Sequence, residues 1–219
     1  VDTACSSALV AAHMAVREMT LGACAHGLAA GVNMIFDVRT SLAARQIGLT
    51  SKSGRSRPFD AQADGYARCE AVSVVALSDD VGVATPRLIG SAVRHHGASA
   101  SLTAPNGQAQ RALLLAARTD ACFTQPAGIV EAHGTGTALG DPIEAGALVD
   151  PGGLTLHDQP SISIGGLKAS VGHAEAAAGL SGLVKLALCL GRSQVAPNAH
   201  LRAINPHVRA QIGDTACVL

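Results

Sequence analysis

A cysteine near the start of the chain has the surroundings of a nucleophile. Cys5 lies in the segment VDTACSSALV, where small polar residues give way to a helical pattern. The unpaired N–H groups and positive dipole end of a helix favour a thiolate over a thiol, and a thiolate can carry an acyl group. An inert buried thiol is the alternative, but the polar flanks are a poor context for packing. The residues therefore favour a reactive, nucleophilic Cys5 over an inert one.

A second segment, EAHGTGTALGDPIE at residues 131–144, combines a histidine, glycines and hydroxyl groups. His133 follows a short predicted strand, and the glycines after it allow the backbone to fold close to a ligand. Thr135 and Thr137 offer hydroxyls to that ligand. The G-x-G-x-x-x-G spacing differs from the dinucleotide-binding fingerprint. The alternative is a glycine turn with a structural histidine.

A third segment, GGLKASVGHAEAAAG at residues 165–179, places three polar side chains between a strand and an apolar helix. They are Lys168, His173 and Glu175. An ion pair between Lys168 and Glu175 would account for two charges beside such an apolar element. The alternative is a surface ion pair beside a capping histidine. Taken together, the three segments indicate one site that contains a thiol, two imidazoles and an ammonium group.

The hydrophobic pattern predicts the elements that position these residues. Helical spacing predicts helices over 5–21, 108–118, 174–190 and from Asp141 onward, with Asp141 as an N-cap. Short apolar runs predict strands over 27–35, 71–77, 87–94, 129–132 and 161–165, of which the first two are expected to be buried. Turn-forming residues predict a surface loop over 48–65. Alternating strands and helices indicate an α/β layered fold with parallel pairing. The pattern restarts near residues 78–86, so we expect two parts, 1–82 and 83–219.

Composition narrows the function classes. The 219 residues are 48% hydrophobic, which is enough for a globular core. With 2% aromatic residues and 16 basic against 16 acidic residues, the chain lacks the features of a nucleic-acid-binding protein. Lys185 interrupts the best candidate for a membrane span. The six cysteines form no C-x-x-C pair, which argues against a zinc ribbon or a redox motif and favours reduced thiols in the cytoplasm. A targeting peptide ahead of the chain stays open.

The chain resembles the ketosynthase domain of type I polyketide synthases, a beta-ketoacyl synthase of the thiolase superfamily that is related to the condensing domain of fatty acid synthases. The resemblance rests on six segments in the family's order: DTACSSALVA, FDAQADGYAR, LTAPNGQAQ, EAHGTGTALGDPIEAGAL, GHAEAAAGLSGLVK and INPH. It implies a thiolase-like α-β-α-β-α sandwich of two pseudo-symmetric halves. This chain would hold the second part of the N-terminal half and most of the C-terminal half.

The resemblance also implies roles for the candidate residues. Cys5 matches the family's acyl-accepting nucleophile. His133 and His173 match its two active-site histidines, which assist decarboxylation of a malonyl thioester and stabilise the resulting enolate. Lys168 matches the family's buried lysine, with Glu175 as its expected ionic partner. A thiol and two donors suit decarboxylative Claisen condensation, whereas a hydrolase would need one base and a path for water.

Binding partners follow from the same resemblance. Thr135 and Thr137 match threonines that hydrogen-bond the phosphopantetheine arm of an acyl carrier protein. The expected substrates are acyl and malonyl thioesters, and the intact protein is expected to be a homodimer. No metal or diffusible cofactor is implied for this domain, since the phosphopantetheine belongs to the carrier.

Several positions depart from the family pattern. Ser170 stands where an asparagine is usual, Cys69 and Ala71 stand where glycines are usual, and His-His-Gly at residues 95–97 replaces an Asn-x-Asp-Gly turn. Ser170 keeps open a non-elongating ketosynthase that binds or transfers chains without condensing them. An inactive dimerisation scaffold and a thiolase-like or chalcone-synthase-like activity are further alternatives. The family's GFGG segment and the first part of its N-terminal half are not in the sequence, so we expect the 219 residues alone to be inactive.

Overall fold

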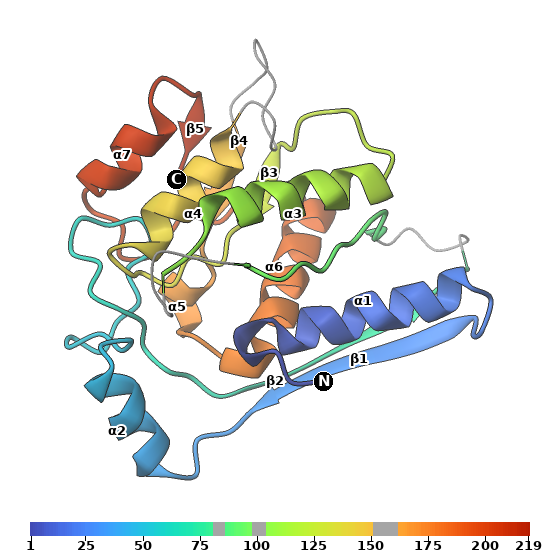
Figure 1. Ribbon diagram of the computed structural model, residues 1–219, viewed down its shortest axis with the longest axis horizontal. Helices are drawn as coiled ribbons and strands as arrows, with labels where there is room; N and C mark the ends of the chain where they lie inside the picture. The colour runs from blue at the N-terminus through green and yellow to red at the C-terminus, as the bar shows by residue number, and fades with distance from the viewer. Residues whose placement is uncertain (81–85, 98–103, 151–161) are drawn as a thin grey trace.

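The computed structural model describes residues 1–80, 86–97, 104–150 and 162–219. Two sheets form its framework (Figure 1). The first pairs two antiparallel strands, β1 (His26–Asn33) and β2 (Ala71–Ser78). The second is parallel, in the order β3 (Ile129–Glu131), β4 (Ile162–Gly165) and β5 (Cys217–Val218).

Two helices lie between the sheets. They are α1 (Ser7–Thr20), which follows the 3₁₀ turn η1 (Ala4–Ser6), and α6 (Ala178–Arg192), which follows the 3₁₀ turn η2 (Glu175–Ala177). Helix α1 contacts β1, and α6 contacts both β2 and β3. Small residues allow this close packing: a Cβ on Gly31 of β1 would lie 2.7 Å from the Cβ of Ala8. Helix α1, which directly follows the segment that carries Cys5, is thereby packed closely on β1.

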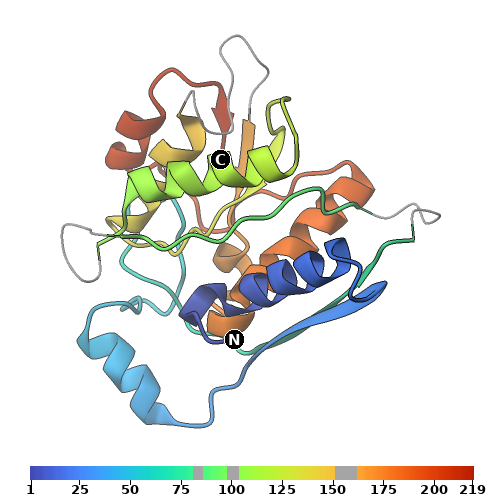
Figure 2. The same cartoon turned by 45° about the vertical axis from the view of Figure 1, so that its right-hand side comes forward.

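The other face of the parallel sheet is covered by helices α3 (Gly107–Asp120), α4 (Gly140–Val149) and α7 (Pro206–Ile212) (Figures 1 and 2). The larger core lies here and includes Phe59, Leu148, Ile162, Ile164 and Val208. The order of layers is therefore sheet, helices, sheet, helices, which confirms the expected layered α/β fold. Helix α2 (Val38–Gln46) stands apart from these layers in both views, and the short helix α5 (Lys168–Val171) follows β4.

The structure corrects some expected elements. Residues 87–94 form no strand, although they lie within the described part of the chain. The β1–β2 pair is antiparallel, and only one of its faces is buried. Asp141 lies inside α4 and does not cap it, because its carboxylate accepts hydrogen bonds from the backbone N–H groups of Phe59 and Gly136. The expected boundary near residues 78–86 falls partly outside the described residues.

Three helices were not predicted, namely α2, α5 and α7. Helix α2 buries none of its residues, so it carries no apolar period, and Asp37 caps it by accepting from the N–H of Arg39. Helix α7 has a recognisable start, because Asn205 caps it and Pro206 occupies its first turn. Among the residues that the structure describes, no helix is long and apolar enough to cross a membrane.

Candidate active site

Three side chains from distant parts of the chain meet at one point. Cys5 lies in η1, directly before α1, and its Sγ is 3.8 Å from Nε2 of His133. The rings of His133 and His173 meet edge to face with centroids 5.6 Å apart. The three possible ligand atoms all lie within 4.8 Å of one another. A thiolate and two imidazoles also form a donor set that zinc accepts, and within the described ranges they are the one such cluster found.

A buried acid–base arrangement holds the loop of His133. The carboxylate of Glu144 in α4 accepts from the backbone N–H groups of His133 and Gly134, at 2.5 and 2.8 Å. The Nζ of Lys168 donates to the backbone carbonyl of His133 at 2.5 Å. Burial raises the pKa of Glu144, although these N–H donors oppose the shift, and burial lowers the pKa of Lys168 while nearby carboxylates, Glu144 first, oppose it. Both ends of the His133 peptide are therefore anchored.

His173 is buried and held by its neighbours in sequence. Its Nδ1 accepts a hydrogen bond of 2.9 Å from the backbone N–H of Glu175. A neutral imidazole that accepts at Nδ1 carries its proton on Nε2. The rings of Tyr66 and His173 meet edge to face with centroids 4.6 Å apart. His173 thus presents an N–H donor from a fixed ring.

Both histidines are neutral at pH 7. Burial, followed by the charge of Lys168 and the neighbouring His173, lowers the pKa of His133 to about 3. Burial, followed by the charge of Lys168, lowers the pKa of His173 to about 4. His133 is exposed as a residue although its ring meets that of His173, whereas His173 is only 3% exposed. The pair can therefore donate hydrogen bonds but does not hold positive charge.

The expected ion pair between Lys168 and Glu175 is wrong. Lys168 is directed at the His133 carbonyl, whereas Glu175 lies beyond the turn at Gly172 and pairs with Arg68, Nε to Oε1 at 2.5 Å. The carboxylates that act on Lys168 are instead those of Glu144, Glu131 and Asp141, in that order. Sequence reasoning assigned no role to Arg68, although it ends the quoted segment FDAQADGYAR. It also assigned no role to Glu144, although that acid lies in the same segment as His133.

The remaining predicted residues lie around this cluster. The hydroxyls of Thr135 and Thr137 are 3.2 Å apart, and the Thr137 hydroxyl accepts from the N–H of Gly140 at the start of α4. Both threonines are half-buried. Ser170 is exposed on α5, two residues from the buried Lys168.

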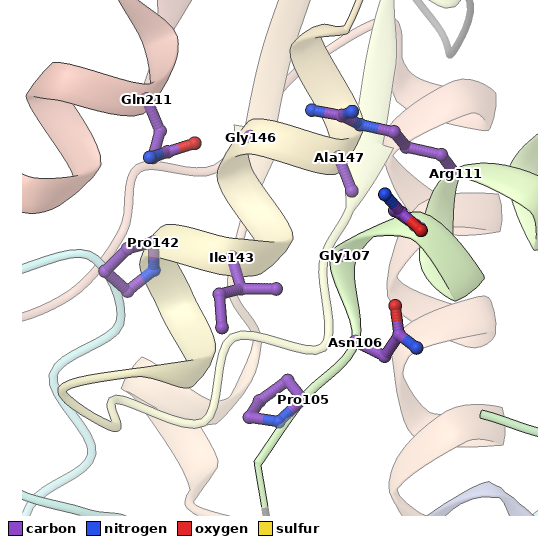
Figure 3. Close-up of a pocket in the computed structure, with 10 residues that line it drawn as sticks. Pro105, Asn106, Gly107, Arg111, Pro142, Ile143, Gly146, Ala147 and Gln211 are labelled. Carbon is purple, nitrogen blue, oxygen red and sulfur yellow. The ribbon is translucent and has the colours of Figure 1, made fainter. Parts of the chain in front are cut away.

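A separate cavity of about 490 Å³ lies between α3, α4 and α7 (Figure 3). Pro105, Ile143 and Gln211 are among the residues that line it. None of the predicted site residues contributes to this lining. The candidate chemistry therefore belongs to the Cys5 cluster and not to the cavity.

Comparisons with known proteins agree on one family. The profile of the beta-ketoacyl synthase N-terminal domain matches residues 1–80, and that of the C-terminal domain matches residues 86–202. A phenolphthiocerol/phthiocerol polyketide synthase protein of Mycobacterium tuberculosis is 43% identical over 95% of this chain and 12% of its own length. A component of the pikromycin polyketide synthase of Streptomyces venezuelae is 41% identical over 92% of this chain and 6% of its own.

Solved structures give the same result. The oxazolomycin ketosynthase domain of Streptomyces albus superposes with a TM-score of 0.90 at 35% identity, covering 99% of this chain and 40% of that one. A ketosynthase from module 6 of the bacillaene synthase of Bacillus subtilis gives 0.86 at 28% identity, over 94% of this chain and 38% of that one. The chain therefore spans less than half of each solved domain and a small part of each synthase.

Proposed function

The chain belongs to the beta-ketoacyl synthase family, and on that premise we propose that it supplies the reaction centre of a polyketide synthase ketosynthase. The observation that carries the proposal is the cluster of Cys5 Sγ with two neutral imidazoles, all within 4.8 Å. A ketosynthase joins two acyl units, and it needs a nucleophile for one and hydrogen-bond donors for the other. Cys5 meets the first need, and His133 and His173 meet the second.

The reaction has two stages. The Cys5 thiolate attacks the carbonyl of an acyl thioester, the bond from that carbonyl to the carrier sulfur breaks, and the carrier leaves as a thiolate that takes up a proton from water. A malonyl thioester then binds, and the two histidines donate hydrogen bonds to its thioester oxygen while the carboxylate leaves as CO₂. The enolate carbon attacks the acyl group on Cys5, and the Cys5 thiolate is released. Each such donor typically contributes about 10²-fold in rate.

The remaining assignments extend this mechanism. Lys168 positions His133 through its backbone carbonyl, which supports the role implied for the buried lysine. The paired hydroxyls of Thr135 and Thr137 would bind the phosphopantetheine arm of an acyl carrier protein. We propose that the phosphopantetheine stays on that carrier, that the intact protein is a homodimer, and that residues 1–82 and 83–219 belong to two halves. The ranges of the two matching family profiles support this last division.

Acyl transfer to Cys5 tests the first stage. The full-length protein that contains this chain is incubated with an acyl thioester and digested. The mass of the peptide that includes Cys5 is then measured by mass spectrometry. We expect one added acyl mass, its loss in Cys5→Ala, and its retention in the matched variant Cys69→Ala, which removes another half-buried thiol. An equal adduct in Cys5→Ala would contradict the assignment.

Release of CO₂ from malonyl-loaded carrier tests the second stage. We expect release in the full-length protein and its loss in His173→Ala. Acylation of Cys5 without CO₂ release would instead favour the non-elongating ketosynthase, for which Ser170 is the motivating departure. Absence of both reactions would favour the scaffold.

A further inference from the structure

We infer that Arg68 and Glu175 form a clamp that positions His173, an inference that rests on the proposed function. Arg68 donates to both carboxylate oxygens of Glu175, from Nε at 2.5 Å and from its terminal nitrogen at 3.0 Å. The Arg68 side chain is 11% exposed and that of Glu175 is 30% exposed. A bidentate arginine–carboxylate pair that is largely shielded from water is a strong interaction, and its two parallel hydrogen bonds define the geometry of both side chains. Arg68 is therefore suited to fix the place of Glu175.

The backbone of Glu175 needs such a constraint. Its φ is +43°, a left-handed conformation that non-glycine residues adopt only when the surroundings determine it. In this conformation the Glu175 N–H donates to Nδ1 of His173. That bond holds the imidazole in the tautomer with its proton on Nε2. The side-chain pair thus acts on His173 through the Glu175 backbone.

The backbone around Arg68 supports the same histidine independently. The His173 N–H donates to the carbonyl of Ala67 at 2.7 Å, and the Cys69 N–H donates to the carbonyl of His173 at 3.0 Å. Arg68 and His173 form an isolated parallel bridge through these two bonds. Arg68, which binds the Glu175 carboxylate, therefore lies directly beside His173, which the Glu175 backbone orients. A shift of Arg68 would move His173, and a shift of His173 would move Arg68.

The clamp also connects the site with an outlying helix. The remaining terminal nitrogen of Arg68 donates to the hydroxyls of Thr40 and Ser41 in α2, at 3.1 and 2.6 Å. Helix α2 buries none of its own residues and stands apart from the layers in Figure 1. Arg68 thus ties α2 to Glu175, and through Glu175 to His173.

The test uses Arg68→Gln, Glu175→Gln and the double variant in the full-length protein. The matched control is Arg17→Gln, which removes an arginine–aspartate pair on the molecular surface. We expect each clamp variant to lower CO₂ release from malonyl-loaded carrier about tenfold, while Cys5 acylation stays within about twofold. The double variant should lower CO₂ release no further than the more damaging single variant, because each single substitution already breaks the same Arg68–Glu175 pair. The control should change neither rate.

Hydrogen exchange provides a readout that does not depend on activity. Loss of the clamp should speed hydrogen exchange at the Glu175 amide. Mass spectrometry of the peptide that contains Glu175 measures this rate, which should stay unchanged in Arg17→Gln. This result would support the clamp even if the wild-type protein released no CO₂, an outcome that would overturn only the proposed function. Unchanged exchange and unchanged CO₂ release, or an equal fall of acylation and CO₂ release, would overturn the clamp. If Arg68→Gln does not fold, Arg68→Lys, which keeps the charge but not the bidentate geometry, should show the same pattern in weaker form.

Discussion

At the scale of single residues, the chemistry depends on two imidazoles that stay neutral. The charge of Lys168 lowers the pKa of both His133 and His173, in addition to the larger effect of burial. Lys168 in turn lies among carboxylates, of which Glu144 acts most strongly. A single buried lysine therefore anchors the His133 carbonyl and adds to the effect of burial that keeps both rings in the donor form.

This arrangement predicts an unusual pH dependence. CO₂ release from malonyl-loaded carrier should stay constant from about pH 8 to about pH 5.5 and fall only as the pH approaches 4, where His173 gains a proton. Initial rates across this range, with circular dichroism at each pH to confirm folding, provide the measurement. A half-maximal rate near pH 6.5 would show that the histidines are not shielded as the structure indicates.

The same shift affects stability. An unfolded histidine has a pKa of about 6.5, whereas His173 has a pKa of about 4 in the folded protein. Between these values the unfolded state binds more protons, so the free energy of unfolding falls as the pH is lowered from about 6.5 to about 4. Urea denaturation of the full-length protein should show this fall, and His173→Gln should reduce it. An equal fall in that variant would assign the effect to other groups.

Replacement of the buried lysine tests its two roles together. Lys168→Met leaves the His133 carbonyl without its donor, which should cost about 1–3 kcal/mol in the free energy of unfolding. It also removes the charge that lowers the pKa of both histidines, so the acid limb of CO₂ release should move to higher pH. Lys52→Met, at an exposed lysine, is the matched control. An unmoved acid limb would contradict the electrostatic role.

At the scale of elements, two loops touch so closely that only glycine fits between them. Gly136 has φ +70°, and a Cβ there would lie 2.9 Å from the backbone nitrogen of Arg57. Gly48 has a nearly equal φ of +73°, but a Cβ at that position would meet no atom within 4 Å. The His133 loop is thus held against the loop before β2 by backbone contact, and the carboxylate of Asp141 bonds to both.

The two glycines provide a matched pair of substitutions. Gly48→Ala should cost about 1–2 kcal/mol in stability, from the left-handed backbone alone. Gly136→Ala carries that strain plus a steric clash, and it should cost more and also slow CO₂ release by displacing Thr135 and Thr137. Urea denaturation and initial rates for both variants provide the comparison. Equal effects would show that the loops can separate without consequence.

At the scale of the whole molecule, one sheet has an uncovered apolar face. Leu28, Val32, Val72 and Val74 lie on the outer face of β1–β2 and are 76%, 54%, 66% and 55% exposed. Register places Val32 directly opposite Val72. No element in the described part of the chain lies against this face. Exposed apolar strands of this kind promote association between chains.

This face predicts the behaviour of the 219 residues when they are expressed alone. We expect the polypeptide to self-associate in light scattering and to show no CO₂ release. Leu28→Lys combined with Val72→Lys should reduce the association, because charges on an exposed strand oppose edge and face pairing. Leu21→Lys, at a residue that is 78% exposed at the end of α1, should not. A monomeric and active polypeptide would contradict the expectation.

Local patterns in the sequence predicted most of the fold. Helices near α1, α3, α4 and α6 and strands near β1, β2, β3 and β4 are confirmed, because apolar period and turn-forming residues are properties of adjacent residues. Helix α2 was missed because it buries nothing, and the antiparallel pairing of β1 with β2 was missed because the partner of a strand is not encoded in the strand itself. The strand expected over 87–94 was wrong, since an apolar run does not by itself supply a neighbour to pair with.

The sequence by itself determined the kinds of groups available: one thiol before a helix, two histidines beside glycine-rich turns, and a lysine in an apolar setting. Only the tertiary structure decided how they are connected. It brings Sγ of Cys5 within 3.8 Å of Nε2 of His133, although the two residues are 128 positions apart in the chain. It also pairs Glu175 with Arg68 and places the ammonium group of Lys168 at the His133 carbonyl. The physical reason is that local chemistry follows from neighbours in sequence, whereas the partner of a charge depends on which distant side chains the packed layers bring together.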